Sequence, residues 1–223
     1  MPKNAERSRD RPIAKPGPPA SPLAAPAAVS AGRQRLPLRA MEDAARLGEQ
    51  LGIDRPLATA NVFRALLQSP SATAGFYGVI EALMFRGRVA ARTRELVILR
   101  MAWRTGAEYV FCHHLRIARD LGISDDEILG VRDPRRCRAY GKTDRAVLRL
   151  ADELHEDAEV RPSTWAALAR AFAPDELVEL LLIGGFWRMV AGFVKSARLP
   201  LDAGVPGWPE GRKPAKDREV RGW

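Results

Sequence analysis

The sequence RTRELVILRMAWRTGAEYVFCHHLRIARDLGISDDEI occupies residues 92–128 and carries the clearest information about the fold. Apolar residues recur in it every three or four positions, which is the spacing of one face of an α-helix. Gly106 divides this pattern into two helices, and Gly122 ends the second one. Ser124 and Glu127 then have the spacing of a capping box, which predicts the start of a third helix. The stretch therefore predicts three consecutive helices with short connections.

The sequence on both sides of this stretch also contains residues that typically begin or end helices. Gly52 and Gly87 follow periodic apolar stretches, and Pro174, with two acidic residues after it, is typical of a first helical turn. No stretch alternates between apolar and polar residues as a half-buried strand does. The predicted fold class is all-α, a bundle of about eight helices. Besides those above, we expect helices over residues 40–51, 56–69, 71–86, 143–157 and 163–172, and a long one from residue 174.

The two ends of the chain differ from its centre in composition. Residues 1–38 form a basic segment rich in Pro and Ala, and residues 205–223 are charged and rich in Pro and Gly. Neither segment has a hydrophobic period, so neither buries enough apolar surface to fold alone. We expect both tails to be disordered and the helical domain to span residues 39–204.

The balance of charge is strongly basic. The chain has 36 Lys and Arg against 27 Asp and Glu, which gives a net charge of +9 and favours contact with polyanions. Residues 1–40 hold eight of the basic and two of the acidic residues, so most of the surplus lies in or beside the predicted tail. No helix-turn-helix, zinc-finger or RNA-binding motif accompanies it. The sequence therefore does not favour a nucleic acid as partner of the folded domain.

The cysteines and the most apolar run indicate the cellular setting. Cys112 and Cys137 are the only cysteines, and two thiols in 223 residues do not make a disulfide framework. We therefore expect a reducing, cytoplasmic setting. The most apolar run, residues 177–194, contains Glu179 and Arg188. These charges favour a buried core helix over a membrane span, so no membrane contact is expected.

Two ionisable residues interrupt apolar helix faces in the stretch around Gly106. On the second helix, His114 shares a stripe with Val110 and Ala118. On the first helix, Glu95 interrupts an equally apolar stripe. Helices joined through one glycine are adjacent, so the two groups can meet in a dry pocket and exchange protons near neutral pH. The alternative is a buried Glu–His hydrogen bond that only orders the core.

Three further residues are candidates for substrate contacts. Arg188 lies in an otherwise apolar run, and a buried arginine needs an anion. That anion would be Glu95, Glu179 or a substrate carboxylate, and a structural or subunit-contact role is the alternative. Trp187 and Tyr109 are expected to line the pocket or the core.

Cys112 and His113 lie on other faces of the second helix. Glu108 and Arg116 flank Cys112 by one turn, so we expect its face to be solvated or to contact another subunit. A reactive thiol needs a lowered pKa, which Arg116 favours and Glu108 opposes. His113 is a further candidate for proton transfer. It diverges by about 100° from His114, and no His pair has the i, i+4 spacing, so we expect no metal site.

The order and spacing of several motifs resemble the carboxymuconolactone decarboxylase-like family, within the AhpD-like superfamily. The resemblance covers roughly residues 50–203 and implies an all-helical homo-oligomer, a trimer or hexamer, with its pocket near a subunit contact. The motifs are R-E-L at 94–96, L-R-M-A-W-R at 99–104, E-Y at 108–109, H-x-x-x-A at 114–118, G-I-S-x-x-E-I at 122–128 and D-R-A-V-L-R-L-A-D-E-L-H at 144–155.

The resemblance implies two kinds of activity. The hydroperoxidases use a C-x-x-C-x-x-x-H motif with an upstream Glu in a proton relay, whereas the decarboxylases act on a small dicarboxylic lactone without a cofactor and keep the His. Aligned through H-x-x-x-A, His114 takes the position of the family His and Glu95 that of the relay Glu. The two thiol positions are Ala107 and Val110, so a dithiol cycle is excluded.

We therefore expect a decarboxylase-like enzyme that uses cofactor-free acid–base chemistry on a small carboxylated, lactone-type molecule. His114 would transfer the proton and Glu95 would be its partner. One alternative is a peroxiredoxin-like activity through Cys112, with an external thiol or Cys137 as the second thiol. The other is a non-catalytic helical oligomer in which Glu95 and His114 are structural.

Overall fold

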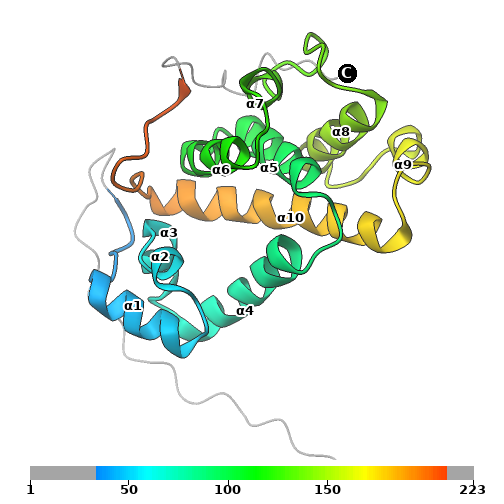
Figure 1. Cartoon of the computed structure of the whole chain (residues 1–223). Helices are drawn as coiled ribbons and strands as arrows, with labels where there is room; N and C mark the ends of the chain where they lie inside the picture. The colour runs from blue at the N-terminus through cyan, green and yellow to red at the C-terminus, as the bar shows by residue number, and fades with distance from the viewer. Residues whose placement is uncertain (1–33, 210–223) are drawn as a thin grey trace, which may run out of the picture. The chain divides into compact units, whose positions relative to one another are not determined.

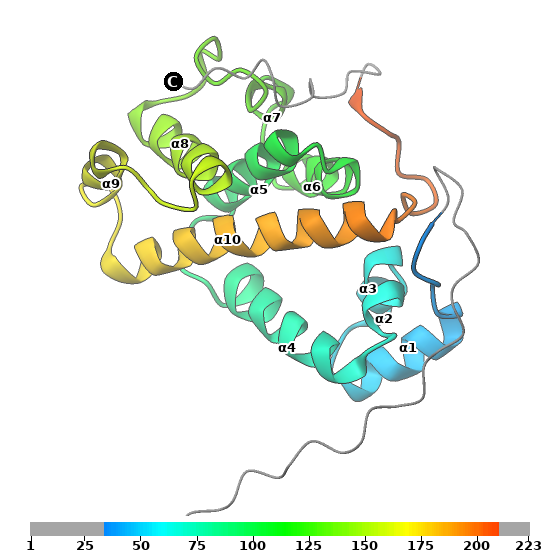
Figure 2. The same cartoon turned by 180° about the vertical axis from the view of Figure 1, so that it is seen from behind.

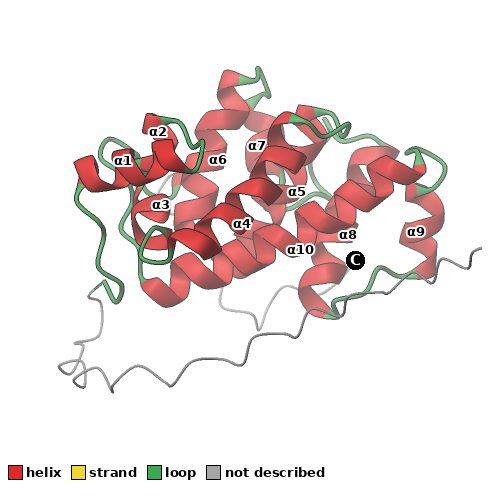
Figure 3. Ribbon diagram, turned by 90° about the horizontal axis from the view of Figure 1, so that it is seen from below, coloured by secondary structure: helices red, strands yellow, loops and turns green. Residues whose placement is uncertain are grey.

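The computed structural model describes residues 34–209, and over this range it contains helices and loops but no strand (Figure 3). The all-α prediction is confirmed. The segments are α1 (Met41–Gln50), α2 (Arg55–Ala58), α3 (Asn61–Leu66), α4 (Pro70–Ile80), the π-helical turn η1 (Glu81–Phe85), α5 (Ala91–Thr105), α6 (Glu108–Asp120), α7 (Asp125–Gly130), α8 (Lys142–Glu156), α9 (Pro162–Leu168) and α10 (Pro174–Ala197).

The described residues form ten α-helices rather than the expected eight or so. The helix predicted over residues 56–69 is divided into α2 and α3, because Ala60 takes an extended conformation and the Asn61 N–H donates to the Asp202 carboxylate at 2.7 Å. The helix predicted over residues 71–86 changes into the π-helical turn η1 for its last five residues. The apolar period of the sequence encodes neither break.

Helix α5 is the centre of the core. It packs against α6, α8 and α10 (Figure 1). Its residues from Arg94 to Ala102 are all buried, as expected for a helix that is covered on every side. At its end, Gly106 adopts the left-handed conformation, with φ of 63°, and turns the chain into α6. The connection through one glycine places α5 and α6 side by side, as predicted from the sequence.

Helix α10 runs along α5 and α8 (Figure 2) and is 24 residues long. It is the one helix of the described range that is long and apolar enough to cross a membrane, by length and composition alone. The sequence predicted a buried core helix here, and this is correct only for the face of α10 that packs against α5 and α8. The other face exposes Val178, Leu182 and Met189, which are 57%, 53% and 48% accessible.

Short parts of both predicted tails contact the helical domain. The Arg35 N–H donates to the Ala197 carbonyl at 2.9 Å. Trp208 is buried and packs against Trp103 and Phe111, with ring centroids 5.6 and 5.0 Å apart. The folded part therefore extends past residue 204. The rest of the predicted disorder, at residues 1–33 and 210–223, lies outside the described residues.

A close approach between α1 and α2 gives a prediction about stability. A Cβ on Gly48 would lie 2.4 Å from the Ala58 Cβ, which is fully buried. Gly48→Ala is therefore expected to destabilise the protein by about 1–3 kcal/mol, because the short Ala58 side chain cannot move away. Gly75→Ala in α4 is the matched control, since a Cβ there meets nothing within 4 Å.

The control should stabilise the protein by up to about 1 kcal/mol, through the better helix propensity of Ala. Urea unfolding of both variants and of the wild type measures the two effects. Effects of opposite sign are expected, and stabilisation by Gly48→Ala would contradict the tight α1–α2 contact.

Candidate acid–base site

The structure brings Glu95 of α5 and His114 of α6 into direct contact. The Nδ1 atom of His114 lies 2.7 Å from Oε2 of Glu95. The Glu95 side chain is fully buried and that of His114 is 13% exposed. Both side chains therefore lie on the packed faces of adjacent helices, where water screens the interaction weakly.

A third residue fixes the protonation of His114. The indole N–H of Trp187, on α10, donates to Nε2 of His114 at 3.1 Å. An indole nitrogen is a donor only, so Nε2 must be the unprotonated nitrogen of the ring. The hydrogen is then on Nδ1 and is donated to the Glu95 carboxylate. His114 is a neutral imidazole whose basic nitrogen is occupied by Trp187.

The second oxygen of Glu95 is not fully bonded. Its Oε1 atom is buried without a hydrogen bond, and the nearest cation is Arg94, whose Nε lies 3.7 Å away and also lacks a hydrogen-bond partner. Buried carboxylate oxygens are normally hydrogen-bonded, so this site retains unused acceptor capacity beside the histidine. The sequence analysis did not identify Arg94. It singled out charged residues on apolar helix faces, and Glu95 lies on such a face of α5 whereas Arg94 does not.

The neighbouring His113 belongs to a different network. Its Nδ1 lies 2.6 Å from the Tyr109 carbonyl, and its Nε2 lies 2.7 Å from Oδ2 of Asp202. The same Asp202 oxygen accepts the Tyr109 hydroxyl at 2.6 Å, and the Tyr109 and His113 rings are stacked. Because both nitrogens of His113 face acceptors, the full set of hydrogen bonds is made only by the protonated ring.

This network ties the chain after α10 to α6 and α3. The Asp202 carboxylate also accepts the Asn61 N–H. Burial raises the pKa of Asp202, but the hydrogen bonds from His113, Tyr109 and Asn61 outweigh it, and the net pKa lies below the ordinary value. Burial and the bond to Asp202 raise the pKa of Tyr109. Asp202 follows the last helix, so no helical period could have identified it.

Asp202→Asn is expected to lower the free energy of unfolding at pH 7 by about 1–3 kcal/mol, since the three donors from Asn61, Tyr109 and His113 lose a charged acceptor. The carboxyl pKa is depressed on folding, so its stabilising effect is present above the ordinary pKa of 3.8 and is lost as pH falls further. Urea unfolding of both proteins at several pH values tests this. A wild-type advantage that grew below pH 3.8 would contradict the assignment.

Cys112 is buried, and the expectation of a solvated or subunit-contact face is wrong for this chain. Cys112 lines a small pocket of about 300 Å³ together with Leu115, Arg119 and residues 206–209. The Trp208 N–H donates to the Glu108 carboxylate and holds this segment in place. Burial, and then the charge of Glu108, raise the pKa of the Cys112 thiol to about 12. At neutral pH it is a thiol and not the nucleophilic thiolate.

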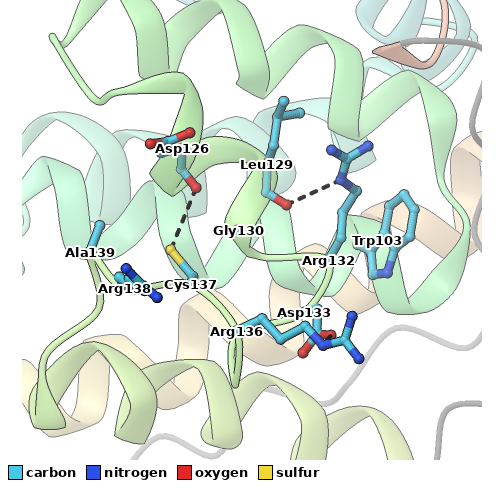
Figure 4. A pocket seen from close by; sticks show the side chains of 10 residues that line it. All are labelled: Trp103, Asp126, Leu129, Gly130, Arg132, Asp133, Arg136, Cys137, Arg138 and Ala139. Carbon is cyan, nitrogen blue, oxygen red and sulfur yellow. Dashed lines mark hydrogen bonds and ion pairs between the residues drawn. The ribbon is translucent and has the colours of Figure 1, made fainter.

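Cys137 lies in the wall of a larger pocket, of about 750 Å³ (Figure 4). Its thiol contacts the Asp126 carbonyl at 3.5 Å, and Arg132 lies over the Trp103 ring at 5.9 Å. Both cysteines are free. Neither Glu95 nor His114 lines this pocket, so it is separate from the acid–base pair.

Arg188 does not join the pair. It is exposed, and the expectation of a buried arginine is wrong. Trp187 occupies the buried face of α10, and the next residue is rotated by about 100° toward solvent. Glu179 is not its partner either, because this carboxylate accepts the N–H groups of Arg88 and Val89. Among residues 34–209, no group of three or more His, Cys, Asp and Glu side chains is placed to hold a metal ion.

A family comparison decides what this helical arrangement is related to. Residues 70–153, from α4 to α8, match the model of the carboxymuconolactone decarboxylase family. Over these residues the chain is similar to that family. The matched residues of this decarboxylase-like chain include Glu95 and His114. No curated protein matches the chain in sequence.

Solved structures share the fold of this decarboxylase-like chain. A peroxidase-related protein from Silicibacter sp. TM1040 has 16% identity and a TM-score of 0.61, over 74% of this chain and 85% of that one. A protein with an alkylhydroperoxidase AhpD core, from Ralstonia eutropha JMP134, has 17% identity and a TM-score of 0.63, over 76% of this chain and 93% of that one. The debrominase Bmp8, in complex with 2,3,4-tribromopyrrole, has 16% identity and a TM-score of 0.63, over 74% of this chain and 90% of that one. At these identities the likeness concerns the fold alone.

Proposed function

We propose that this chain is a cofactor-free acid–base enzyme that acts on a small carboxylated molecule of the lactone type. The observation that carries the proposal is the 2.7 Å contact between the fully buried Glu95 and His114. A histidine paired with a buried carboxylate can act as a general acid and base. The match of residues 70–153 to the carboxymuconolactone decarboxylase family supports the reaction class, and the substrate itself is part of the proposal.

In this scheme Nε2 of His114 is the atom that takes and returns the proton. Glu95 keeps the other nitrogen protonated and stabilises the imidazolium that forms when Nε2 accepts a proton. The indole N–H of Trp187 occupies Nε2 in the structure. Substrate binding must therefore displace this N–H before proton transfer. Trp187 would act as a positioning residue that fixes the histidine tautomer in the resting enzyme.

The same groups account for loss of carbon dioxide without a cofactor. When the carbon–carbon bond to the carboxylate breaks, its electron pair passes to the adjacent carbon and is delocalised onto the lactone carbonyl as an enolate. Once substrate has displaced the Trp187 N–H, Nε2 of His114 takes up a proton from solvent. The imidazolium then gives this proton to the enolate carbon, and the ring returns to neutral. The lactone is its own electron acceptor, so the protein has only to position groups and move one proton.

The experiment is a search for turnover with purified full-length protein. Five- and six-membered lactones that carry carboxylates are incubated without added cofactor, and carbon dioxide release is measured. Release that is kept by Cys112→Ser and lost in His114→Gln is expected. Release that depended on Cys112 would overturn the acid–base assignment. Peroxide consumption lost in Cys112→Ser would instead favour the peroxiredoxin-like alternative, for which the buried thiol gives no support.

We also propose that the chain forms a homo-oligomer, a trimer or hexamer, through α10, and that it works in the cytoplasm. Val178, Leu182 and Met189 line the exposed face of α10 at intervals of four and seven residues. Exposed apolar stripes of this kind are typical of protein contacts. Leu182→Glu is expected to reduce the assembly to a monomer in light scattering, while Arg116→Glu, on α6, leaves it unchanged. An unchanged mass for Leu182→Glu would exclude this face.

A further inference from the structure

A basic pocket lies between α8 and α9, two helices that pack side by side. Its volume is about 430 Å³. The first two turns of α8 form one wall, and the end of α9 with the residues after it forms the other. We call it the α8–α9 pocket, and its lining residues are Lys142, Thr143, Arg145, Arg149, Ala167, Arg170 and Ala171.

Four of these seven lining residues are basic and none is acidic. The acidic residues nearby in the sequence have other partners. Asp144 pairs with Arg92 at 2.7 Å and accepts the Gly141 N–H. Glu153 accepts the Thr164 hydroxyl and the Arg161 N–H. No carboxylate lines the pocket, and such a concave basic surface concentrates anions.

The helix geometry adds to this charge. Lys142 and Thr143 occupy the first turn of α8, where backbone N–H groups have no partner within the helix. The positive end of the helix dipole lies there, so a cation such as Lys142 is unfavourable in that turn and an anion is favourable. The hydroxyl of Thr143 is an additional donor. An oxyanion in the pocket would therefore meet side-chain donors close to the positive end of this helix.

One of the basic side chains is held in a fixed orientation. The guanidinium of Arg145 donates to the carbonyls of Pro134 and Cys137. It is therefore ordered before any ligand binds, which reduces the entropy lost on binding. The same bonds connect the pocket to the loop that carries Cys137, on the wall of the larger pocket in Figure 4.

The shape and chemistry of the lining limit the ligand. The volume exceeds that of a single phosphate, and the four positive charges suit an anion with several negative charges. No aromatic ring lines the pocket, so it offers no platform for stacking a base. A single pocket between two helices is also not the extended track that a nucleic acid strand needs. These features favour a small phosphorylated molecule over a nucleotide or a polymer.

We propose that the α8–α9 pocket binds a small multivalent phosphate, such as a diphosphate or a phosphorylated metabolite. This site is distinct from the Glu95–His114 pair and does not depend on the proposed reaction.

The test is calorimetric titration of the full chain with sodium diphosphate and with inorganic phosphate at low salt. Diphosphate is expected to bind more tightly than phosphate, and added salt should weaken both. Lys142→Ala and Arg170→Ala should each weaken diphosphate binding about tenfold, because each removes a charge-assisted contact. Arg116→Ala removes an exposed arginine outside the pocket and should leave the affinity unchanged.

The basic N-terminal segment is present in every variant, so binding by that segment would give equal affinities throughout and would overturn the proposal. Absence of binding in the wild type would do the same. Circular dichroism and melting temperature check that each variant is folded, and Arg170→Lys should retain more affinity than Arg170→Ala. Binding to duplex DNA or to phosphatidylglycerol vesicles, with none to diphosphate, would overturn the assignment of a small molecule.

Discussion

His114→Gln is expected to lower kcat by about 10²–10⁴-fold, which is the contribution of a well-placed general acid–base group. The glutamine amide can donate to Glu95 through its nitrogen and accept the Trp187 N–H through its oxygen, so the hydrogen bonds of the wild type are largely replaced. It cannot accept and return a proton at neutral pH. The variant should therefore lose turnover while its urea midpoint remains close to that of the wild type.

His113→Gln is the matched control on the same helix. It should lose stability, because His113 pairs with Asp202, but it should keep most of the turnover. The two variants thus separate proton transfer from support of the fold. If His114→Gln kept wild-type turnover, or lost stability and activity in equal measure to His113→Gln, the pair of Glu95 and His114 would be structural.

Asp152→Ala is expected to lower the free energy of unfolding by about 3–5 kcal/mol, because it leaves a buried charge without its partner. Asp152 of α8 accepts two hydrogen bonds from Arg100 of α5, at 2.7 and 2.9 Å, and the two side chains are 2% and 4% exposed. Arg100 also donates to the Val131 carbonyl. One ion pair therefore joins the central helix, α8 and the loop after α7.

The control is an ion pair with the same geometry on the surface. Arg119 and Asp125 also make two hydrogen bonds, at 2.7 and 2.9 Å, but their side chains are 49% and 58% exposed. Asp125→Ala should cost less than about 1 kcal/mol, since water solvates the arginine that remains. Urea unfolding measures both variants. Equal losses would show that burial is not what makes the Arg100–Asp152 pair important.

Several features of the fold could be predicted because they depend on short-range chemistry. Gly106 and the Ser124–Glu127 capping box mark helix ends in the structure as they do in the sequence. The contact of Glu95 with His114 follows from two local facts, the face that each residue shares with its helical neighbours and the single glycine between the helices. The division of residues 56–69 could not be predicted, because it depends on a hydrogen bond from Asn61 to a carboxylate 141 residues away.

The candidate site shows the same limit. Trp187 was expected near the pocket, but its role in fixing the tautomer of His114 depends on how α10 crosses α6. The sequence analysis predicted an exposed Cys112 and a buried Arg188, whereas in the structure Cys112 is buried and Arg188 is exposed. A helical wheel gives the angle between side chains on one helix. It does not show which side of that helix other segments of the chain pack against. Residues 206–209 line the same small pocket as Cys112, while nothing in the described range buries Arg188.

The sequence by itself therefore determined the all-α class, most helix ends and the pairing of Glu95 with His114, because helical periodicity and capping act within a few residues. Only the tertiary structure decided which thiol is buried, which hydrogen-bond partners His113 and His114 have, and where the basic pocket lies. Burial and hydrogen-bond partners decide each of these properties. The segments that supply them, α9, α10 and residues 200–209, are far from the affected residues along the chain.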